Sequence, residues 1–411
     1  MSPYYDKQET RDPLVREYDL MTRLSALIAH AVECAPAYAD FLRGARAEDI
    51  CTREALAGLP VLRKPELLER QRARRPFGGH TTRSMGPSLR RVFASPGPLY
   101  EPEGTRSDYW RMARALFAAG FRAGDLVHNA FSYHFTPAGS IIETAAHALG
   151  CTVFPAGTGQ TEQQVQAVAD LQPNAYAGTP SFLRILLEKS AETGMPCSFT
   201  KALVSGEAFP PSLRDWLAER GVAAYQAYAT ADVGLIAYET PAREGLVVGE
   251  DVVLEIVRPG TGDPVAPGEV GEVVVTAFNS EYPLIRYGTG DLSAVLPGTS
   301  PCGRTNTRIR GWLGRADQTT KVRGMFVHPS QIAEVAKRHP QLGKVRLVVD
   351  NPGGADRMCL HCELEQPPEG LAGALATSVR DLTKLRAEIL FCAPGSLPND
   401  GKVIADLRKF E

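Results

Sequence analysis

Residues 126–155 read LVHNAFSYHFTPAGSIIETAAHALGCTVFP, and the fold class follows from this stretch. It begins with an apolar run, Leu126 to Phe131, continues with helical spacing from Ser140 to Leu149, and ends in a second apolar run, Thr152 to Pro155. A strand, a helix and a strand in direct succession predict a βαβ unit. Its two strands are expected to be parallel, because the helix returns the chain to the edge from which it started.

The same alternation extends in both directions along the chain. Further strands are predicted at Ala175 to Ala177 and Ala202 to Ser205, and further helices at Asp108 to Ala119 and Pro180 to Glu192. The sequence therefore predicts an α/β domain with a largely parallel, helix-covered sheet.

Different patterns flank this region. From Pro13 to about Leu68 the spacing is helical, and a β-rich section with antiparallel character begins near Gly245. The chain from about Gly314 onward predicts a compact α+β module. Its expected elements are helices at Pro329 to Arg338 and Leu371 to Arg386, and strands at Lys344 to Val349, Met358 to Glu363 and Glu388 to Phe391.

Length and composition favour an ordinary globular protein of at least two domains. The chain has 411 residues, 44% hydrophobic and 22% charged, with a formal net charge of -2. Such a balance argues against nucleic acid or a membrane surface as a partner. The N-terminus has no basic segment followed by an apolar run, so we expect a cytoplasmic protein. The eight irregularly placed cysteines do not predict a disulfide framework.

Three short segments, taken singly, each allow two interpretations. Residues 282–291, YPLIRYGTGD, place Asp291 where a carboxylate can accept hydrogen bonds from ribose hydroxyls, or form an ordinary Gly-Asp turn. Residues 314–324 suit either a mobile linker or a basic surface hairpin. Residues 398–402, PNDGK, put Lys402 on a tip from which it can reach an anion, or where water simply solvates it.

In this order the three segments resemble motifs of adenylate-forming enzymes, and specifically of phenylacetate-CoA ligases. The resemblance implies that Asp291 binds the ribose, that Arg315 faces the nucleotide and that Asp317 is the hinge. It further implies that the pantetheine arm of coenzyme A passes beside Gly324. Lys402 would touch the acyl carboxylate and the α-phosphate during adenylation.

The intervening chain resembles the same family. Residues 205–208, SGEA, resemble the adenine-binding turn, which assigns Gly206 and Glu207 to the nucleotide. In residues 225–232, YQAYATAD, the resemblance implies that Tyr228 stacks on adenine beside Ala229 and that Asp232 helps to hold Mg2+.

The resemblance implies an AMP-forming acid-CoA ligase that adenylates a carboxylic acid, aromatic by family likeness, with ATP and transfers the acyl group to coenzyme A. We expect the adenylate-forming enzyme fold, with an N-terminal domain at residues 1–316 and a mobile lid domain at residues 317–411. Small molecules are the expected partners, and a homodimer stays open. The rival hypotheses are a non-catalytic nucleotide or acyl-CoA binding homologue and an adenylate-forming enzyme with another acceptor.

One segment departs from the family. A Ser/Thr/Gly-rich loop ending in Gly-Lys-Pro normally wraps the phosphates, whereas residues 93–104 read FASPGPLYEPEG. Ser95 and Gly97 keep positions at which the family contacts the nucleotide. The prolines remove amide donors, and Glu101 and Glu103 stand where a cation is expected. Arg106 is a candidate for the missing positive charge. Three outcomes are open: a ligase with a rebuilt loop, an enzyme using another phosphate donor or a preformed adenylate, or a binding protein.

The acyl pocket is predicted at the end of the first strand of the βαβ unit. Tyr133 or His134 would line it, with Ala138 and Gly139 leaving room for the acid, although His134 can equally satisfy a backbone carbonyl. In residues 359–362, CLHC, strand alternation puts Cys359 and His361 on one face and Cys362 on the other, so packing is favoured over a metal site.

Overall fold

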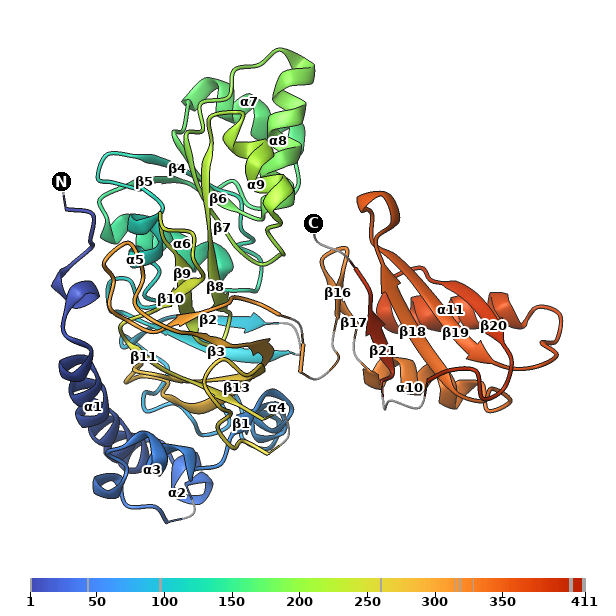
Figure 1. The fold of residues 1–411 in the computed structure, drawn as a ribbon, viewed down its shortest axis with the longest axis horizontal. Helices are drawn as coiled ribbons and strands as arrows, with labels where there is room; N and C mark the ends of the chain where they lie inside the picture. Colours follow the sequence, from blue (N-terminus) through green and yellow to red (C-terminus); the bar gives the residue numbers. More distant parts are fainter. Residues whose placement is uncertain are drawn as a thin grey trace. The chain divides into compact units, whose positions relative to one another are not determined.

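The computed structural model of this chain describes residues 2–42, 44–95, 98–258, 261–313, 315–316, 318, 320–327, 329–398 and 402–408. The chain divides into a larger unit, Met1–Gly314, and a smaller unit, Arg315–Glu411, whose elements are labelled in Figure 1. No helix within the described ranges combines the length and the apolar character needed to cross a membrane.

A mixed sheet in the larger unit contains the stretch from residue 126 to residue 155. Its parallel part has the order β5-β4-β6-β7-β8, formed by β4 (Leu126–Asn129), β5 (Thr152–Phe154), β6 (Ala175–Gly178), β7 (Lys201–Val204) and β8 (Ala223–Thr230). Beyond β8 the pairing becomes antiparallel through β9 (Gly234–Glu239), β10 (Leu246–Val248), β15 (Arg308–Ile309) and β14 (Val295–Leu296). The predicted parallel βαβ arrangement is confirmed.

Helices cover both faces of this sheet, as Figure 1 shows. Ala175 and Ala177 share a core with α5 (Ala113–Ala118) and α6 (Ala138–Ala148). Tyr176, between them in β6, instead packs with α7 (Thr161–Leu171), α8 (Pro180–Thr193) and α9 (Pro211–Ala218). Successive strand side chains point to opposite faces, so a strand buried on both sides needs this double cover.

A second sheet has the order β1-β13-β12-β11, formed by β1 (Leu62–Arg63), β13 (Leu284–Ser293), β12 (Gly271–Ala277) and β11 (Val252–Val257). The helices α1 (Pro13–Cys34), α2 (Ala37–Phe41), α3 (Arg53–Ala57) and α4 (Lys64–Ala73) share its hydrophobic core. β1 runs parallel to β13 with Arg63 opposite Gly288. Lys64, the next residue, therefore begins α4 beside the part of β13 that leads to Asp291.

Residues 89–104 form a separate hairpin. β2 (Leu89–Ser95) pairs antiparallel with β3 (Leu99–Gly104), and Ser95 lies opposite Leu99. The resemblance predicts a phosphate-binding loop in this stretch, whereas the structure pairs the residues on either side of positions 96–98. The sequence at those positions, Pro-Gly-Pro, is typical of a turn.

Two helices are shorter than the sequence predicted. α5 begins at Ala113 instead of Asp108, because Asp108 (φ 49°) and Arg111 (φ 64°) have left-handed backbone conformations. The Asp108 carboxylate accepts hydrogen bonds from the Ala113 amide at 3.1 and 3.2 Å. α11 (Leu371–Thr383) ends before Arg386, because Lys384 is also left-handed, with φ 64°.

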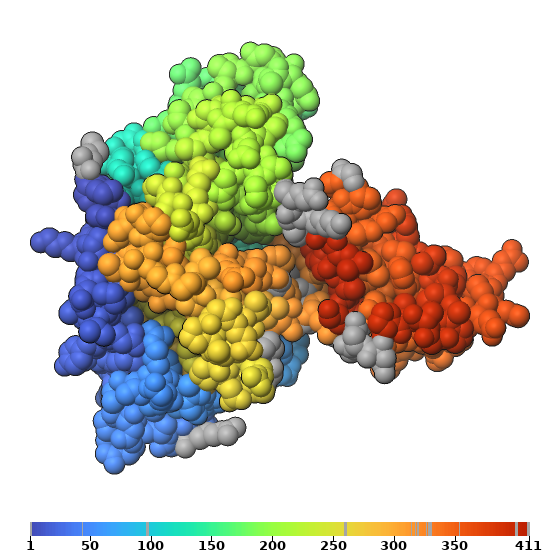
Figure 2. All heavy atoms as spheres, in the orientation of Figure 1, coloured from blue at the N-terminus to red at the C-terminus, as the bar shows by residue number. Residues whose placement is uncertain are grey.

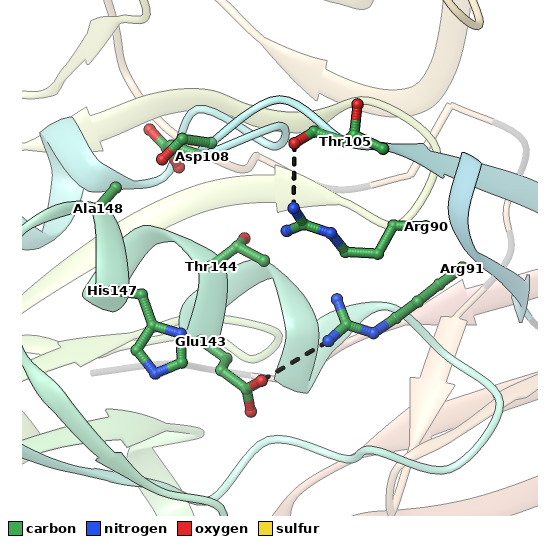
Figure 3. A pocket seen from close by; sticks show the side chains of 9 residues that line it. Arg90, Arg91, Thr105, Asp108, Glu143, Thr144, His147 and Ala148 are labelled. Atoms are coloured by element: carbon green, nitrogen blue, oxygen red, sulfur yellow. Dashed lines mark hydrogen bonds and ion pairs between the residues drawn. The ribbon is translucent and has the colours of Figure 1, made fainter. Parts of the chain in front are cut away.

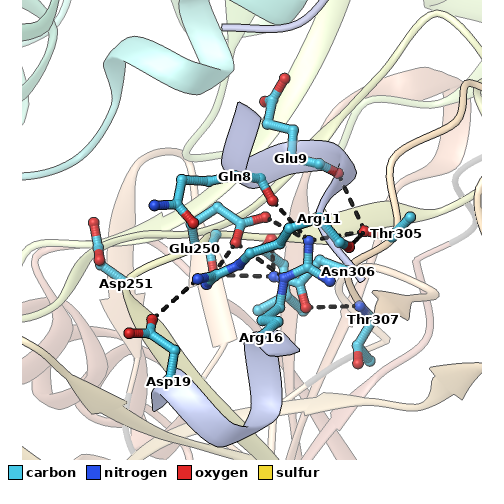
Figure 4. Close-up of polar contacts among 12 residues, drawn as sticks. Gln8, Glu9, Arg11, Arg16, Asp19, Glu250, Asp251, Thr305, Asn306 and Thr307 are labelled. Atoms are coloured by element: carbon cyan, nitrogen blue, oxygen red, sulfur yellow. Dashed lines mark hydrogen bonds and ion pairs between the residues drawn. The ribbon is translucent and has the colours of Figure 1, made fainter. Parts of the chain in front are cut away.

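Buried ion pairs fix the N-terminal segment to the rest of the larger unit. Arg16 donates to both oxygens of Glu250, at 3.0 and 3.2 Å, and Arg11 adds a third contact at 3.1 Å. The Thr305 amide donates to the Glu9 carbonyl at 3.0 Å. Figure 4 shows this cluster, and Figure 2 shows the blue N-terminal segment against the orange segment near residue 300.

The smaller unit is an α+β module, as predicted for this part of the sequence. Its main sheet has the order β20-β19-β18-β21, formed by β18 (Val345–Asp350), β19 (Arg357–Glu363), β20 (Glu388–Cys392) and β21 (Ile404–Asp406). The helices α10 (Pro329–Arg338) and α11 pack against it. A hairpin of β16 (Thr320–Val322) and β17 (Met325–Val327) lies near the start of the unit.

Candidate functional site

Two of the residues predicted to bind the nucleotide come together in the larger unit. The Tyr228 hydroxyl donates to Asp291 Oδ2 at 2.9 Å, and its oxygen lies 3.2 Å from Thr289 Oγ1. Trp312 Nε1 donates to Asp291 Oδ1 at 3.1 Å. Asp291 is only 7% exposed, so these donors fix the orientation of its carboxylate. An ionised carboxylate only accepts hydrogen bonds, and this one is suited to sugar hydroxyls.

A β-bulge positions Tyr228. Tyr228 lies opposite Ala237 in β9, but the next residue, Ala229, lies opposite Leu235, so one residue of the partner strand is skipped. Such a bulge bends the strand and changes the direction of a side chain. It places Tyr228 on β8 within reach of Asp291 on β13, which belongs to the other sheet.

The predicted adenine-binding turn follows β7. The Ser205 hydroxyl donates to the Ala227 carbonyl at 2.8 Å, which ties the turn to β8. Gly206 has φ 82°, a conformation that glycine adopts without strain, and a Cβ there would come no closer than 3.9 Å to Phe131 or Thr179. Glu207 accepts a hydrogen bond of 2.5 Å from Ser181. The backbone conformation of Gly206 is therefore the feature of this turn that favours glycine.

A second group of side chains surrounds Asp232. Lys64 Nζ lies 3.6 Å from Asp232 Oδ1, and the Asp232 side chain is 6% exposed. Glu101 of the hairpin lies beside it. Burial, followed by the charge of Asp232, raises the pKa of Glu101 well above its ordinary value. Burial and the same charge raise the pKa of the Tyr287 hydroxyl.

The hairpin's other polar side chains are bonded within the protein. The Ser95 hydroxyl donates to Glu101 Oε1 at 2.6 Å. Glu103 accepts from Arg91 at 3.1 Å and from the Ser140 hydroxyl at 2.9 Å. The Arg106 guanidinium, the candidate for the missing positive charge, donates to Asn279 Oδ1 and to the Tyr109 carbonyl.

The residues predicted for the acyl pocket follow β4. Asn129 Nδ2 donates to the Tyr133 hydroxyl at 2.8 Å and to the Gly139 carbonyl at 2.9 Å. A Cβ on Gly139 would lie 2.8 Å from the Tyr133 ring, so this ring covers Gly139, which opens no space of its own. Ala138 is half-buried at the start of α6, and His134 is exposed. The Ala94 amide donates to the Phe135 carbonyl at 2.8 Å, which places this loop beside the hairpin.

The other predicted residues lie in the smaller unit or outside the described residues. Arg315 is half-buried and the Lys402 side chain is exposed. Gly324 has φ 81° in the turn between β16 and β17, with open space where a Cβ would stand. Gly97 and Asp317 lie outside the described residues.

Comparisons with known proteins identify the family of this chain. A model of the AMP-binding enzyme family matches residues 106–279. A phenylacetate-coenzyme A ligase of Thermus thermophilus is 30% identical over 94% of this chain and 95% of its own length. This chain belongs to the adenylate-forming, AMP-binding enzyme family.

Further relatives extend the likeness of this adenylate-forming enzyme. A phenylacetate-coenzyme A ligase of Aromatoleum evansii is also 30% identical, over 91% of this chain and 89% of that protein. The crystal structure of a 2-hydroxyisobutyryl-CoA ligase, in complex with 2-HIB-AMP and CoA, covers 100% of this chain and 93% of its own. Its TM-score is 0.83 at 25% identity. The predicted adenylate-forming fold is thereby confirmed, and the family supports CoA ligase activity in general.

The residues around Asp232 do not fit a magnesium ion as the structure places them. A carboxylate is the right donor, but Mg2+ keeps several waters in an octahedral shell. Glu101 Oε2 and Asp232 Oδ1 are both closed to solvent, and the two carboxyl groups lie against each other. The Lys64 ammonium also lies 3.6 Å from the same Asp232 oxygen. We therefore assign no magnesium-binding role to these residues.

A hollow of about 230 Å³ lies at the opposite end of the hairpin. Figure 3 shows Arg91 and Glu143 facing each other there, 3.7 Å apart, with Arg90 bonded to the Thr105 carbonyl. Arg90 precedes Ser95 by five residues of a strand, which corresponds to roughly 16 Å. The hollow is therefore distinct from the group around Asp232.

Sequence reasoning missed Trp312, Thr289 and Lys64. Thr289 stands inside the quoted motif, two residues before Asp291, so its place in the strand was a usable signal. Trp312 and Lys64 carried no local signal. Lys64 reaches the site because β1 pairs with β13, and Trp312 because the Leu313 amide bonds to the Leu292 carbonyl beside Asp291.

Proposed function

We propose that this adenylate-forming enzyme is an AMP-forming acid-CoA ligase. It would join a carboxylic acid to AMP, with ATP as the donor, and then transfer the acyl group to coenzyme A. The observation that carries the proposal is the Tyr228–Asp291 hydrogen bond of 2.9 Å, with Trp312 holding the second carboxylate oxygen. The pair supports the proposal because a carboxylate can accept from ribose hydroxyls and a neighbouring aromatic ring can stack on adenine.

The chemistry assigns separate tasks to the two units. Asp291 would orient the ribose, and Tyr228 and the turn at Gly206 would hold the adenine in the larger unit. In the smaller unit we propose Lys402 as the contact of the acyl carboxylate and α-phosphate, Arg315 as a nucleotide contact, and the surface at Gly324 as the path of pantetheine. A lysine placed where charge develops on a phosphate stabilises the transition state of adenylation.

An aromatic acid is proposed as the substrate, on the likeness to the phenylacetate-CoA ligases. The likeness to 2-hydroxyisobutyryl-CoA ligase makes a small hydroxy acid the natural comparison. We also propose a cytoplasmic location, where ATP and coenzyme A are available.

The test is acyl-CoA formation, followed by mass spectrometry, with phenylacetate, benzoate, acetate and 2-hydroxyisobutyrate. Each acid is supplied with ATP, Mg2+ and CoA, and in parallel as its synthetic adenylate with CoA. We expect acyl-CoA and AMP from at least one acid, and at least a tenfold lower yield from Asp291→Ala. Absence of acyl-CoA by both routes, while AMP or CoA still raises the melting temperature, would contradict the proposal.

A second candidate function is a non-catalytic nucleotide-binding homologue. It predicts no acyl-CoA by either route, while AMP or CoA still raises the melting temperature. The observation favouring it is the hairpin, in which Ser95, Glu101 and Glu103 are all bonded within the protein. The adenylate arm of the test separates the two candidates, because transfer to CoA does not need the phosphate loop.

A further inference from the structure

The order of the parallel strands shows where the chain changes its winding direction. β4 pairs with β5 on one side and with β6 on the other, so the chain passes over β4 when it goes from β5 to β6. The helix after β4, α6, packs on one face of the sheet, and the helix after β6, α8, packs on the opposite face. The loops that follow β4 and β6 therefore diverge, and open α/β sheets bind their ligands at such a point.

Tyr133 belongs to the first of these two loops. Phe131, two residues before it, and Thr179, which follows β6, both lie 3.9 Å from the position that a Cβ would have on Gly206. The loops after β4, β6 and β7 therefore approach one another here. The Tyr133 side chain is half-buried in this region, so its environment bears directly on the proposed acyl pocket.

The Tyr133 ring is held at its face and at its hydroxyl. A Cβ on Gly139 would stand 2.8 Å from the ring, so one face of the ring lies against this glycine. Asn129 Nδ2 donates to the Tyr133 hydroxyl at 2.8 Å. The Glu143 carboxylate lies beside the same hydroxyl, and burial, followed by this carboxylate, raises the pKa of Tyr133. The hydroxyl oxygen thus accepts from the amide, and its proton is directed towards the carboxylate.

Glu143 is itself held in place from the hairpin. Arg91 Nη2 lies 3.7 Å from Glu143 Oε1, as Figure 3 shows. Nη1 of the same guanidinium donates to Glu103 at 3.1 Å and to the Ser140 hydroxyl at 2.9 Å. The Glu103 side chain is fully buried, so it anchors Arg91. A continuous set of contacts therefore runs from β3 through Arg91 and Glu143 to Tyr133.

These contacts determine which part of Tyr133 remains for a ligand. Its hydroxyl is engaged by Asn129 and Glu143, and one ring face covers Gly139. The opposite ring face remains, and this surface is apolar. Aromatic rings bind flat apolar groups well, because stacking adds to the gain from buried area. A hydroxyl on the acid would gain no hydrogen bond from a ring face.

Resting on the proposed ligase function, we infer that Tyr133 is a fixed wall of the acyl pocket, positioned by Glu143, and that it selects acids with a flat apolar group over small hydroxy acids. Glu143 is a positioning residue, because it acts through the Tyr133 hydroxyl. A ring already held in its binding orientation loses little freedom when the acid binds. Removing Glu143 should therefore weaken binding of the acid without weakening binding of the nucleotide.

The first test compares acids in the wild-type protein. Phenylacetate, benzoate and 2-hydroxyisobutyrate are each supplied with ATP, Mg2+ and CoA, and in parallel as synthetic adenylates with CoA. We expect kcat/KM for at least one aryl acid to be at least tenfold higher than for 2-hydroxyisobutyrate. Equal values, or a preference for the hydroxy acid, would overturn the inference and leave the ligase function standing. No acyl-CoA from any of the three by either route would overturn both.

The second test separates Glu143 from a general structural role. Glu143→Ala should raise KM for the preferred aryl acid at least fivefold, with KM for ATP within twofold of wild type. Glu143→Gln keeps an acceptor for the hydroxyl and should stay within twofold for both substrates. Glu162→Ala, exposed on α7, is the matched control. An unchanged KM for the acid in Glu143→Ala would overturn the positioning role.

A double variant shows whether Glu143 acts through the hydroxyl. Tyr133→Phe keeps the ring and lacks the hydroxyl, so adding Glu143→Ala to it should change KM for the acid less than twofold. A fivefold rise in this background as well would show that Glu143 acts elsewhere, and would overturn its assigned role.

A spectroscopic test does not depend on turnover. In protein labelled with 3-fluorotyrosine, the 19F resonance of Tyr133 is identified by its absence from Tyr133→Phe. We expect this resonance to titrate at a lower pH in Glu143→Ala than in wild type, by about one pH unit or more, because a neighbouring carboxylate disfavours the phenolate. The same titration in both proteins would contradict the contact between Glu143 and the hydroxyl, and with it the inference.

Discussion

The hydroxyl of Tyr228 and the carboxylate of Asp291 lie 2.9 Å apart, although 63 residues separate them along the chain. One stands on β8 of the mixed sheet and the other on β13 of the second sheet. The contact joins the two sheets of the larger unit at the proposed nucleotide site, and Trp312 completes it from beyond β15.

Removing the carboxylate of this pair should weaken AMP binding. We expect Asp291→Ala to raise the Kd for AMP by roughly 10- to 100-fold, because hydrogen bonds to a charged group contribute about 1.5–3 kcal/mol. Tyr228→Phe keeps the ring and should cost less than about fivefold, whereas Tyr228→Ala should cost more. Isothermal titration calorimetry measures the Kd for AMP of each variant. Asp170→Asn, on the exposed end of α7, is the control.

Lys402→Ala should separate the two proposed half-reactions. We expect acyl-CoA formation from acid and ATP to fall to background, because the lysine is proposed to act on the α-phosphate during adenylation. Formation from a supplied adenylate should stay within about threefold of wild type, since that step does not build charge in the same place. Lys337→Ala, exposed on α10, is the control, and equal loss of both steps would refute the assignment.

His80 should make the larger unit sensitive to acid. Its side chain is fully buried against Tyr38, and burial, aided by the charge of Arg70, lowers the pKa of His80 from 6.5 to about 4. The unfolded chain therefore binds this proton more readily, so stability falls as the pH drops from about 6.5 towards 4, by up to about 3 kcal/mol.

The matched measurement is the melting temperature at pH 7 and pH 5. The melting temperature of His80→Phe should fall less between pH 7 and pH 5 than that of wild type. His147→Gln, at an exposed position on α6, should show the same fall as wild type. An unchanged drop in His80→Phe would show that other groups carry the pH dependence.

The close contact of Gly139 with Tyr133 reverses the usual effect of a helical Gly→Ala change. A Cβ at Gly139 would stand 2.8 Å from the Tyr133 ring, and overpacking of this kind costs about 1–3 kcal/mol. Gly373→Ala in α11 meets no atom within 4 Å and should instead stabilise its unit by roughly 0.5–1 kcal/mol. Urea unfolding of both variants tests whether the free energy of unfolding changes in opposite directions. If both variants were stabilised, the close contact between Gly139 and Tyr133 would be excluded.

The buried pair of Arg16 with Glu250 should hold the N-terminal segment. Both side chains are nearly inaccessible, so Glu250→Gln leaves an uncompensated buried guanidinium and should cost about 3–5 kcal/mol. Glu48→Gln, which removes an exposed partner of Arg46, should leave the denaturant midpoint unchanged. Similar midpoints for the two variants would show that the cluster in Figure 4 does not anchor the segment.

Local sequence patterns were sufficient to predict the architecture. The apolar runs at Leu126 and Ala175 and the helical spacing between them predict parallel strands, because each pattern reports which neighbours a residue has within its own element. The bounds of α10, Pro329–Arg338, were predicted without error, whereas α5 was predicted too long, since the left-handed conformation of Asp108 has no periodic signature.

Tertiary contacts account for what the local patterns could not predict. The sequence marked Ser95, Glu101 and Asp232 as individual residues, but the 2.6 Å bond between the first two, and the place of Glu101 beside Asp232, arise when a hairpin packs near the end of β8. Lys64 reaches the site through the pairing of β1 with β13, and Trp312 through its hydrogen bond to Asp291. Periodicity reports only neighbours within one element, so contacts between elements depend on packing, which a single sequence does not display.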